Sequence, residues 1–468
     1  MKTLVLNCGS SSLKYQLIET DNDKVMVKGV VEKIGTSKAL FTYCPAGRKE
    51  FRDTLEAKDH DTALSIVLRM LTDAVSGVIK NIAEIDAVGH RVVHGGETYS
   101  QSVIIDDEVI AQIEACIVFA PLHNPPNLVG IRACSKVLPG VNQVAVFDTA
   151  FHQKMPKMAF LYALPYSMYS KHGIRRYGFH GTSHSYVSQK AAELLNVESG
   201  KDFKVIVCHL GNGASVAAIK NGVSLDTSMG FTPLEGLVMG TRCGDIDPAI
   251  VTYLIQKEDL SPSEVDTILN KQSGLKGIAR TTNDMREIRE EANEGSELHQ
   301  LAIDLFCYRV KKYIGSYMAV LNGADAVVFT AGIGENDAEM RRQVLEGMDF
   351  LGIEIDLEKN AKHETIISKG PTTVMVIKTN EELAIAHETK KVLQQKWSDT
   401  KKERERRELL AKLANISGPD RTKIILLWSQ DQNVSREQLF KKVKSAVTID
   451  ITEEIFGALL IEMGITCT

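Results

Sequence analysis

No long apolar run occurs in the sequence, and its absence limits where the protein can act. After Met1 and Lys2 only a few apolar residues precede Asn7, far too few for the core of a signal peptide. No stretch approaches the roughly 18 apolar residues that a membrane-spanning helix needs. We therefore expect a cytoplasmic protein with no membrane segment.

The chain also lacks a basic excess and paired cysteines. It has 55 Lys and Arg against 60 Asp and Glu, a net charge of −5, whereas a protein that binds nucleic acid should carry a basic surface. The eight cysteines are dispersed and form no C-x-x-C pair, so neither a zinc ribbon nor a thioredoxin-type motif is indicated. Buried free thiols in a reducing compartment are the expected state.

Several well-known catalytic motifs are missing as well. The sequence holds no G-x-x-x-x-G-K-[ST], which excludes a P-loop NTPase, and no H-R-D or D-F-G set, which excludes a protein kinase. The segment 332–334 lacks the third glycine of a dinucleotide-binding fingerprint, and no H-E-x-x-H is present. What remains for nucleotide binding is a set of Gly- and Ser-rich turns.

Two of these turns lie in a strand–turn–strand unit that occurs twice. The turns at 8–12 and 209–213 are each flanked by two short apolar runs. Their small residues let backbone N–H groups approach phosphate oxygens closely. The repeat suggests two topologically similar halves, with a pair of unrelated hairpins as the alternative.

Apolar runs that end in polar loops alternate with helical patterns, which indicates α/β domains. The chain is long enough for two such domains and a small third unit. Ligands of open α/β sheets bind beyond the carboxyl ends of the strands, so the polar loops should meet there. The expected strands are 87–93, 143–147, 326–329 and 373–377, and the expected helices are 62–80, 184–195 and 297–321.

The composition changes after the last expected α/β element. A dense mixed-charge run at 401–408 favours a solvated helix with i,i+4 ion pairs over a nucleic-acid-binding tail. Residues 424–428 predict a strand or a short helix, and 435–447 and 452–463 predict two amphipathic helices. We expect a small, mainly helical extension over 397–468.

Six segments resemble, in order, the signature segments of the acetate kinase family. The resemblance covers residues 1 to about 395 and does not extend to 396–468. The segments are Asn7-Cys8-Gly9-Ser10-Ser11-Ser12-Leu13-Lys14, Gly173-Ile174-Arg175-Arg176-Tyr177-Gly178-Phe179-His180-Gly181-Thr182-Ser183-His184, His209-Leu210-Gly211-Asn212-Gly213, Met239-Gly240-Thr241-Arg242-Cys243-Gly244-Asp245, Gly332-Ile333-Gly334-Glu335-Asn336 and Thr379-Asn380-Glu381-Glu382.

The resemblance implies two duplicated actin-like (ribonuclease H-like) α/β domains around a nucleotide cleft. It places an N-terminal domain at 1–150, to which a helix near 381–395 returns, and a C-terminal domain with the nucleotide site at 151–380. The extension at 397–468 is not recognised, and its partner is unknown. The resemblance further implies a homodimer that transfers the ATP γ-phosphoryl group directly to acetate, giving acetyl phosphate and ADP, with Mg²⁺, or Mn²⁺ in its place.

The resemblance also assigns catalytic roles. Arg91 holds the substrate carboxylate, while Arg242 and His180 stabilise the transferring phosphoryl group. Asp148 orients metal-bound water or substrate. A carboxylate is already ionised at neutral pH, so cations and positioning should supply the catalysis instead of a strong base.

The other expected site residues fall into three groups. By the resemblance, Asn7 and Glu381 hold the metal. A zinc site formed by the histidines is not indicated, because their spacing fits no common zinc pattern. Besides Arg91, the substrate side comprises Val93, Leu122, His123, Phe179 and Pro233. The expected ATP-binding residues are Ser10, Ser12, Lys14, His209, Leu210, Gly211, Asn212, Gly213, Asp284, Met285, Arg286, Gly332, Ile333, Gly334, Glu335 and Asn336.

Pocket size decides between the closest alternatives. Valine at position 93 leaves less room than alanine would, which favours acetate over propionate, although one methylene gives only about 1–3 kcal/mol of discrimination. A propionate or butyrate kinase is therefore the nearest rival. A non-catalytic actin-like nucleotide switch would keep the phosphate turns but would have no need of Arg91, Arg242 and His180 together.

Overall fold

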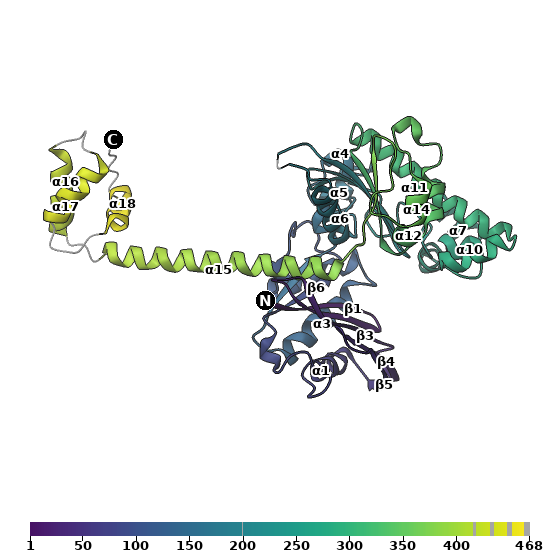
Figure 1. Cartoon of the computed structure of the whole chain (residues 1–468), viewed down its shortest axis with the longest axis horizontal. Helices are drawn as coiled ribbons and strands as arrows, with labels where there is room; N and C mark the ends of the chain where they lie inside the picture. Colours follow the sequence, from purple (N-terminus) through teal and green to yellow (C-terminus); the bar gives the residue numbers. More distant parts are fainter. Residues whose placement is uncertain (199, 415–417, 431–434, 447–451, 463–468) are drawn as a thin grey trace. The chain divides into compact units, whose positions relative to one another are not determined.

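The computed structural model describes residues 1–198, 200–414, 418–430, 435–446 and 452–462 (Figure 1). They divide into two compact units, Met1–Val392 and Leu393–Thr468. None of the helices in these ranges combines the length and the apolar content needed to cross a bilayer.

The first half of the larger unit contains a sheet of strand order β5-β4-β3-β2-β1-β6-β8-β7. Strand β1 pairs antiparallel with β2 and parallel with β6, and β6 pairs parallel with β8. The strands are β1 (Lys2–Gly9), β2 (Ser12–Glu19), β3 (Lys24–Glu32), β4 (Thr36–Pro45), β5 (Phe51–Ala57), β6 (Ala87–Val92), β7 (Val103–Ile104) and β8 (Asn142–Phe147).

A second sheet, of order β11-β10-β9-β12-β13, repeats the central part of the first. In both sheets one strand has two successive antiparallel strands on one side and two parallel strands on the other. The two similar α/β halves expected from the sequence are thus confirmed, and the turns at 8–12 and 209–213 occupy equivalent places. The strands are β9 (Lys204–Leu210), β10 (Ala214–Lys220), β11 (Val223–Thr227), β12 (Ala326–Thr330) and β13 (Thr373–Val376).

Strands β3, β4 and β5 were not predicted, because exposed residues interrupt the buried ones in β3 and β4 and make up most of β5. By contrast, every residue of β12 is buried, and so are all residues of β9 after the first. Such strands appear in the sequence as continuous apolar runs. The outer strands interleave charged residues with buried ones such as Val27, Phe41 and Tyr43.

Helices cover the faces of both sheets, and one expected helix was too long. Helix α1 (His60–Leu71) begins where the Asp59 side chain accepts from the Thr62 amide, and it ends well before residue 80. The Asp73 carboxylate accepts from the amides of Val75 and Ser76 at 3.0 and 2.8 Å, which turns the chain. The other helices of this unit that bear on the site are α3 (Asn124–Val137), α6 (Gly181–Leu194), α10 (Met285–Asn293), α11 (Glu297–Val320), α12 (Ala331–Asn336) and α13 (Ala338–Leu345).

Helix α15 (Glu381–Ala414) begins in the larger unit, where its first turns pack on β6. A Cβ placed on Gly89 would lie 2.4 Å from Thr389 Oγ1 and 2.8 Å from Ile385 Cγ2. Glycine at position 89 is therefore what allows the helix to approach the sheet. The same helix continues through the mixed-charge run, so residues 401–408 are helical.

The smaller unit contains α16 (Gly418–Ser429), α17 (Arg436–Ala446) and α18 (Glu453–Glu462). Residues 424–428 are therefore helical, and the two amphipathic helices are confirmed; their expected last positions, 447 and 463, lie outside the described residues. The buried side chains include Ile424, Leu439, Val443, Phe456 and Leu459. These helices form a small apolar core of their own.

Candidate active site

The site begins with an ion pair between two neighbouring parallel strands. Arg91, in β6, donates from Nε to Asp148 Oδ1 at 3.0 Å and from Nη2 to Oδ2 at 2.7 Å. Asp148 directly follows β8 and is only 2% exposed. The Asp148 carboxylate raises the pKa of Arg91, whereas burial raises the pKa of Asp148 against the opposing effect of the guanidinium. The pair keeps the fork of Arg91 fixed.

A small polar cavity of about 160 Å³ adjoins this pair. Arg91 Nε lies 3.9 Å from Glu381 Oε2, and Asn7 stands opposite Lys14 in the β1–β2 ladder. The expected metal residues Asn7 and Glu381 are thus brought together. The lining residues are Asn7, Lys14, Arg91, Thr379, Glu381, Glu382 and Ile385.

The chemistry of this cavity fits a magnesium ion that keeps most of its water. Mg²⁺ prefers one or two carboxylates plus water and substrate phosphate. The amide of Asn7 and the carboxylates of Glu381 and Glu382 supply oxygen donors of that kind. Among the described residues no cluster of three or more His, Cys, Asp or Glu side chains could hold a metal ion alone.

His180 lies at the start of α6, with its backbone in the left-handed region at φ 57°. Its ring stacks on that of His209 with centroids 4.2 Å apart, and its Nδ1 lies 2.9 Å from Ser215 Oγ. His209 Nδ1 in turn lies 2.8 Å from Ser183 Oγ. Burial holds the pKa of His180 well below its ordinary value, so the ring is neutral at pH 7.

Arg242 approaches His180 across the β9–β10 turn. A Cβ placed on Gly213 would lie 3.4 Å from His180 Nε2 and 3.7 Å from Arg242 Nη1, so both groups border this turn. The same Nη1 donates to the Pro233 carbonyl oxygen at 3.1 Å. Burial, Arg242 and Arg91 lower the pKa of His123 to about 4. A neutral His123 therefore shares this region with the two arginines.

The residues expected to form the acyl pocket differ in burial. Val93 and Phe179 are both buried and belong to one apolar cluster, which also includes Ala120. Leu122, in contrast, is 55% exposed and stands outside that cluster. The assignment of Val93, Leu122 and Phe179 to an acyl pocket therefore stays a prediction.

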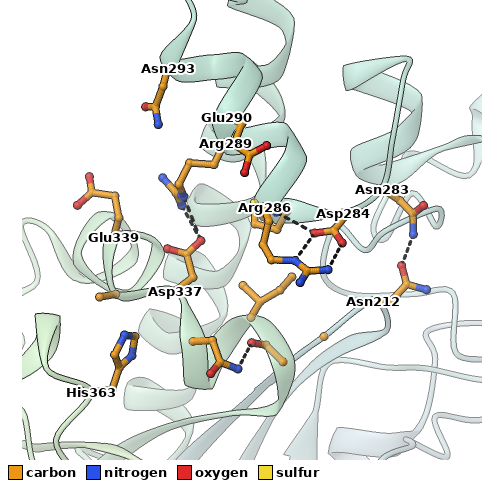
Figure 2. A pocket seen from close by; sticks show the side chains of 16 residues that line it. Asn212, Asn283, Asp284, Arg286, Arg289, Glu290, Asn293, Asp337, Glu339 and His363 are labelled. Carbon is orange, nitrogen blue, oxygen red and sulfur yellow. Dashed lines mark hydrogen bonds and ion pairs between the residues drawn. The ribbon is translucent and has the colours of Figure 1, made fainter.

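A larger cavity of about 920 Å³ lies between α10 and α12 (Figure 2). Its size suits a nucleotide, since ligand pockets typically span ≈ 300–1,000 Å³. Eight of the expected ATP-binding residues line it: Gly211, Asn212, Asp284, Met285, Arg286, Gly332, Ile333 and Asn336. The residues that the sequence analysis missed are Asn283, Arg289, Glu290, Asn293, Asp337, Ala338, Glu339 and His363.

Figure 2 shows how polar pairs shape the walls of this cavity. Asn283 Nδ2 donates to Asn212 Oδ1 at 2.7 Å, which joins the α10 side to the β9–β10 turn. Arg289 Nη2 donates to Asp337 Oδ2 at 2.8 Å and joins α10 to the start of α13. Arg289 lies one helical turn after the Asp284-Met285-Arg286 segment, and this spacing could have indicated from the sequence that it faces the same cavity.

Glu335, an expected ATP-binding residue, uses its carboxylate within the protein. Its Oε1 accepts from the amide of Ala331 at 2.8 Å and from the amide of Thr379 at 3.0 Å, and the residue does not line the cavity. The carboxylate thus links the start of α12 to the segment before Glu381 through two hydrogen bonds. Gly334 and Leu210 are also excluded from the lining, because both are buried in the protein interior.

The remaining expected ATP-binding residues lie apart from the larger cavity. His209 and Gly213 border the Arg242 side of the β9–β10 turn, as described above. Lys14 lines the small polar cavity. Ser10 and Ser12 lie in and after the β1–β2 turn, which is the counterpart of the β9–β10 turn in the first sheet. They line neither of the two cavities described here.

Comparison with known proteins agrees with this geometry. Residues 2–387 match the model of the acetokinase family. An acetate kinase of Alkaliphilus metalliredigens is 55% identical over 397 residues, which are 84% of this chain and 100% of that protein. An acetate kinase of Caldanaerobacter subterraneus is 56% identical over 398 residues, 84% of this chain and 99% of that protein.

Solved structures match over the same region. The crystal structure of Porphyromonas gingivalis acetate kinase has a TM-score of 0.79 at 47% identity, over 84% of this chain and 99% of that chain. A propionate kinase from Francisella tularensis also has a TM-score of 0.79, at 46% identity and with the same coverage. Residues 388–468 lie beyond the family match.

Proposed function

The chain belongs to the acetokinase family, and from this we propose that it transfers the γ-phosphoryl group of ATP to acetate, reversibly, giving acetyl phosphate and ADP. The observation that carries the proposal is the convergence of Arg91, Arg242 and His180 beside a nucleotide-sized cavity. A non-catalytic nucleotide switch would not need that cluster. Hydroxylamine trapping of the acyl phosphate, with purified protein, ATP, magnesium and a panel of short acids, tests it directly.

Charge neutralisation is the task of the arginines in this reaction. Acetate is ionised at neutral pH, so the barrier is the approach of one anion to another. Arg91 uses two of its five N–H donors on Asp148 and presents the rest to the acetate carboxylate. We assign Asp148 the role of holding that fork and Arg242 the role of stabilising charge on the transferring phosphoryl group.

Magnesium completes the proposed site. Asn7 and Glu381 would hold it, directly or through water, and Mn²⁺ could take its place. When bound, the ion neutralises charge on the nucleotide phosphates. Lys14, in the same cavity, adds a fixed positive charge that does not depend on the metal.

The acyl pocket favours acetate, and a propionate kinase is the second candidate. The Francisella tularensis propionate kinase, at 46% identity, shows that a relative with this fold carries that name. In this chain Val93 and Phe179 are both buried, and we assign them to the acyl pocket, where valine at position 93 leaves less room for another methylene than alanine would. The ratio of kcat/KM for acetate to that for propionate separates the two candidates.

We further propose a cytoplasmic homodimer. The cysteines of the described residues are free thiols, in keeping with a reducing compartment. Helix α11 exposes an apolar stripe at helical spacing, formed by Leu298, Leu301, Leu305 and Tyr308. Such a stripe suits a partner subunit, and sedimentation equilibrium of the purified protein would give the subunit number.

A further inference from the structure

One buried hydroxyl connects His180 to a second histidine that no proposed role uses. Ser215, in β10, is fully buried, and its Oγ lies 2.9 Å from His180 Nδ1 and 2.7 Å from His184 Nε2. His184 follows His180 by one turn of α6 and is itself fully buried. The three side chains therefore form a single hydrogen-bonded row that begins at His180.

A serine hydroxyl has one proton and can also accept. If both rings donated to Ser215, its proton would have no partner, because among the described residues Ser215 Oγ bonds only these two rings. The row therefore has two fully bonded arrangements. In the first, His184 Nε2–H donates to Ser215, Ser215 donates to His180 Nδ1, and His180 carries its proton on Nε2. In the second, His180 Nδ1–H donates to Ser215, Ser215 donates to His184 Nε2, and His184 carries its proton on Nδ1. The partner of one ring nitrogen thus fixes the protonation of the other.

The far end of the row distinguishes the two arrangements. His184 Nδ1 is buried and has no hydrogen-bond partner within the part of the chain that the structure describes. The second arrangement would leave an unpaired N–H there, and orphaned buried N–H groups are rare in proteins. The first arrangement leaves only a ring lone pair at that point, and it presents His180 Nε2–H near Arg242 at the β9–β10 turn.

We propose that Ser215 and His184 are positioning residues that hold His180 as the neutral Nε2–H tautomer. In this tautomer Nε2–H serves as a hydrogen-bond donor to the transferring phosphoryl group. This catalytic part of the inference rests on the proposed function. A donor fixed in advance needs no reorientation when charge develops in the transition state. The row also explains why a histidine with no access to substrate is placed behind the site.

The tautomer can be read without turnover. In the full-length protein, labelled with ¹⁵N at histidine, the long-range ¹H–¹⁵N correlation pattern of His180 should show Nε2 protonated, with ADP and magnesium present. A pattern with Nδ1 protonated overturns the inference, whatever the activity. If the wild-type protein forms no acyl phosphate while His180 shows Nε2–H, the proposed function fails and the tautomer assignment stands.

Variants of His184 test whether the row supports catalysis. Glutamine can place its amide nitrogen near the position of His184 Nε2 and donate to Ser215, whereas asparagine is too short. We expect His184→Asn and Ser215→Ala to lower kcat at least tenfold, with KM for ATP and acetate within threefold. His184→Gln should keep kcat within threefold of the wild type.

The control is Ser188→Ala, which removes another buried hydroxyl from α6. The Ser188 hydroxyl donates to the Ser185 carbonyl oxygen and takes no part in the row. This variant should leave kcat unchanged. Equal activity of the glutamine and asparagine variants, or a kcat of Ser215→Ala equal to that of Ser188→Ala, would overturn the positioning role. Should His184→Asn fail to fold, the NMR measurement on the wild type still decides the tautomer.

Discussion

Asp148 binds Arg91 through both of its carboxylate oxygens, at 3.0 and 2.7 Å, from the end of a neighbouring parallel strand. The pairing leaves three of the five N–H donors of the guanidinium for other partners. An arginine fixed in this way can meet a carboxylate without first losing the rotational freedom of its own side chain.

Replacing Asp148 should therefore act through Arg91. In Asp148→Asn one N–H of the new amide would face an N–H of Arg91, and one charge-assisted hydrogen bond, about 1.5–3 kcal/mol, would be lost. We expect kcat/KM for acetate to fall roughly 10- to 100-fold while KM for ATP changes little. The control is Asp202→Asn, at an exposed carboxylate outside the site, which should leave kcat/KM for acetate unchanged. An unchanged kcat/KM for acetate in the Asp148 variant would contradict the proposal that Asp148 holds the guanidinium of Arg91.

Arg242→Ala removes a cation that borders the β9–β10 turn together with His180. We expect kcat to fall about 10³-fold or more, because the lost charge acts mainly in the transition state. Nucleotide affinity, measured by calorimetry with ADP and magnesium, should change little, since Arg242 does not line the larger cavity. A variant with near wild-type kcat would show that the phosphoryl group lies elsewhere.

Val93→Ala should enlarge the acyl pocket. Removing two methyl groups from the side chain at position 93 makes room for another methylene, which we expect to raise the propionate-to-acetate ratio of kcat/KM about tenfold, on the order of 1.4 kcal/mol. The ratio is measured by hydroxylamine trapping. If it stays constant, Val93 does not line the acyl pocket.

Buried histidines should make the fold sensitive to mild acid. Burial lowers the pKa values of His90, His94 and His152 to about 4, 3 and 4, against roughly 6.5 in an unfolded chain. Below pH 6.5 the unfolded state binds protons that the folded state refuses, so the stability present above that pH is lost as the pH falls towards 4. Each histidine should cost roughly 1.4 kcal/mol at pH 5.5.

The measurement for this prediction is the free energy of unfolding in urea at pH 7 and at pH 5.5. His90→Gln, which removes one of the three groups, should show a smaller decrease between the two pH values than the wild type. His172→Gln, at an exposed histidine, serves as the control and should follow the wild type. Equal pH dependence of the His90 and His172 variants would contradict the assignment.

Truncation after Lys396 should spare the chemistry. Every residue proposed for the site precedes α15 or lies in its first turn, and the cut leaves the buried Leu393 in place. We expect kcat within about threefold of the full chain, a difference under roughly 0.7 kcal/mol. A truncated protein that remains folded by circular dichroism yet loses activity would show that residues 397–468 take part in the mechanism.

Much of the fold was predictable because the central strands are buried on both faces and appear as apolar runs. Strands β3 to β5 could not be predicted because many of their residues face solvent. The end of α1 could not be predicted because it depends on the turn in which the Asp73 side chain accepts from backbone amides. Asn7, Arg91 and Asp148 lie at or near the ends of strands and Glu381 at the start of α15, and the α/β topology brings these ends together.

Other parts of the site depend on contacts that no spacing reveals. Glu335 has the sequence position of a nucleotide ligand, but its carboxylate is occupied by two backbone amides, one of them at Thr379. The row from His180 through Ser215 to His184 joins a helix to a strand from another segment, so the sequence gives no signal of it. Which side chain a polar group meets is decided by packing across the chain.

The close packing of α15 against Gly89 has a consequence for folding during protein synthesis. All strands of the first sheet have left the ribosome once residue 147 has emerged, yet the helix that covers β6 at Gly89 is made only after the whole second sheet. A nascent chain that has reached β13 therefore still shows an uncovered patch at the middle of its first sheet. Domains generally fold as they are synthesised, so the first sheet completes its packing at Gly89 only when Ile385 and Thr389 have been made.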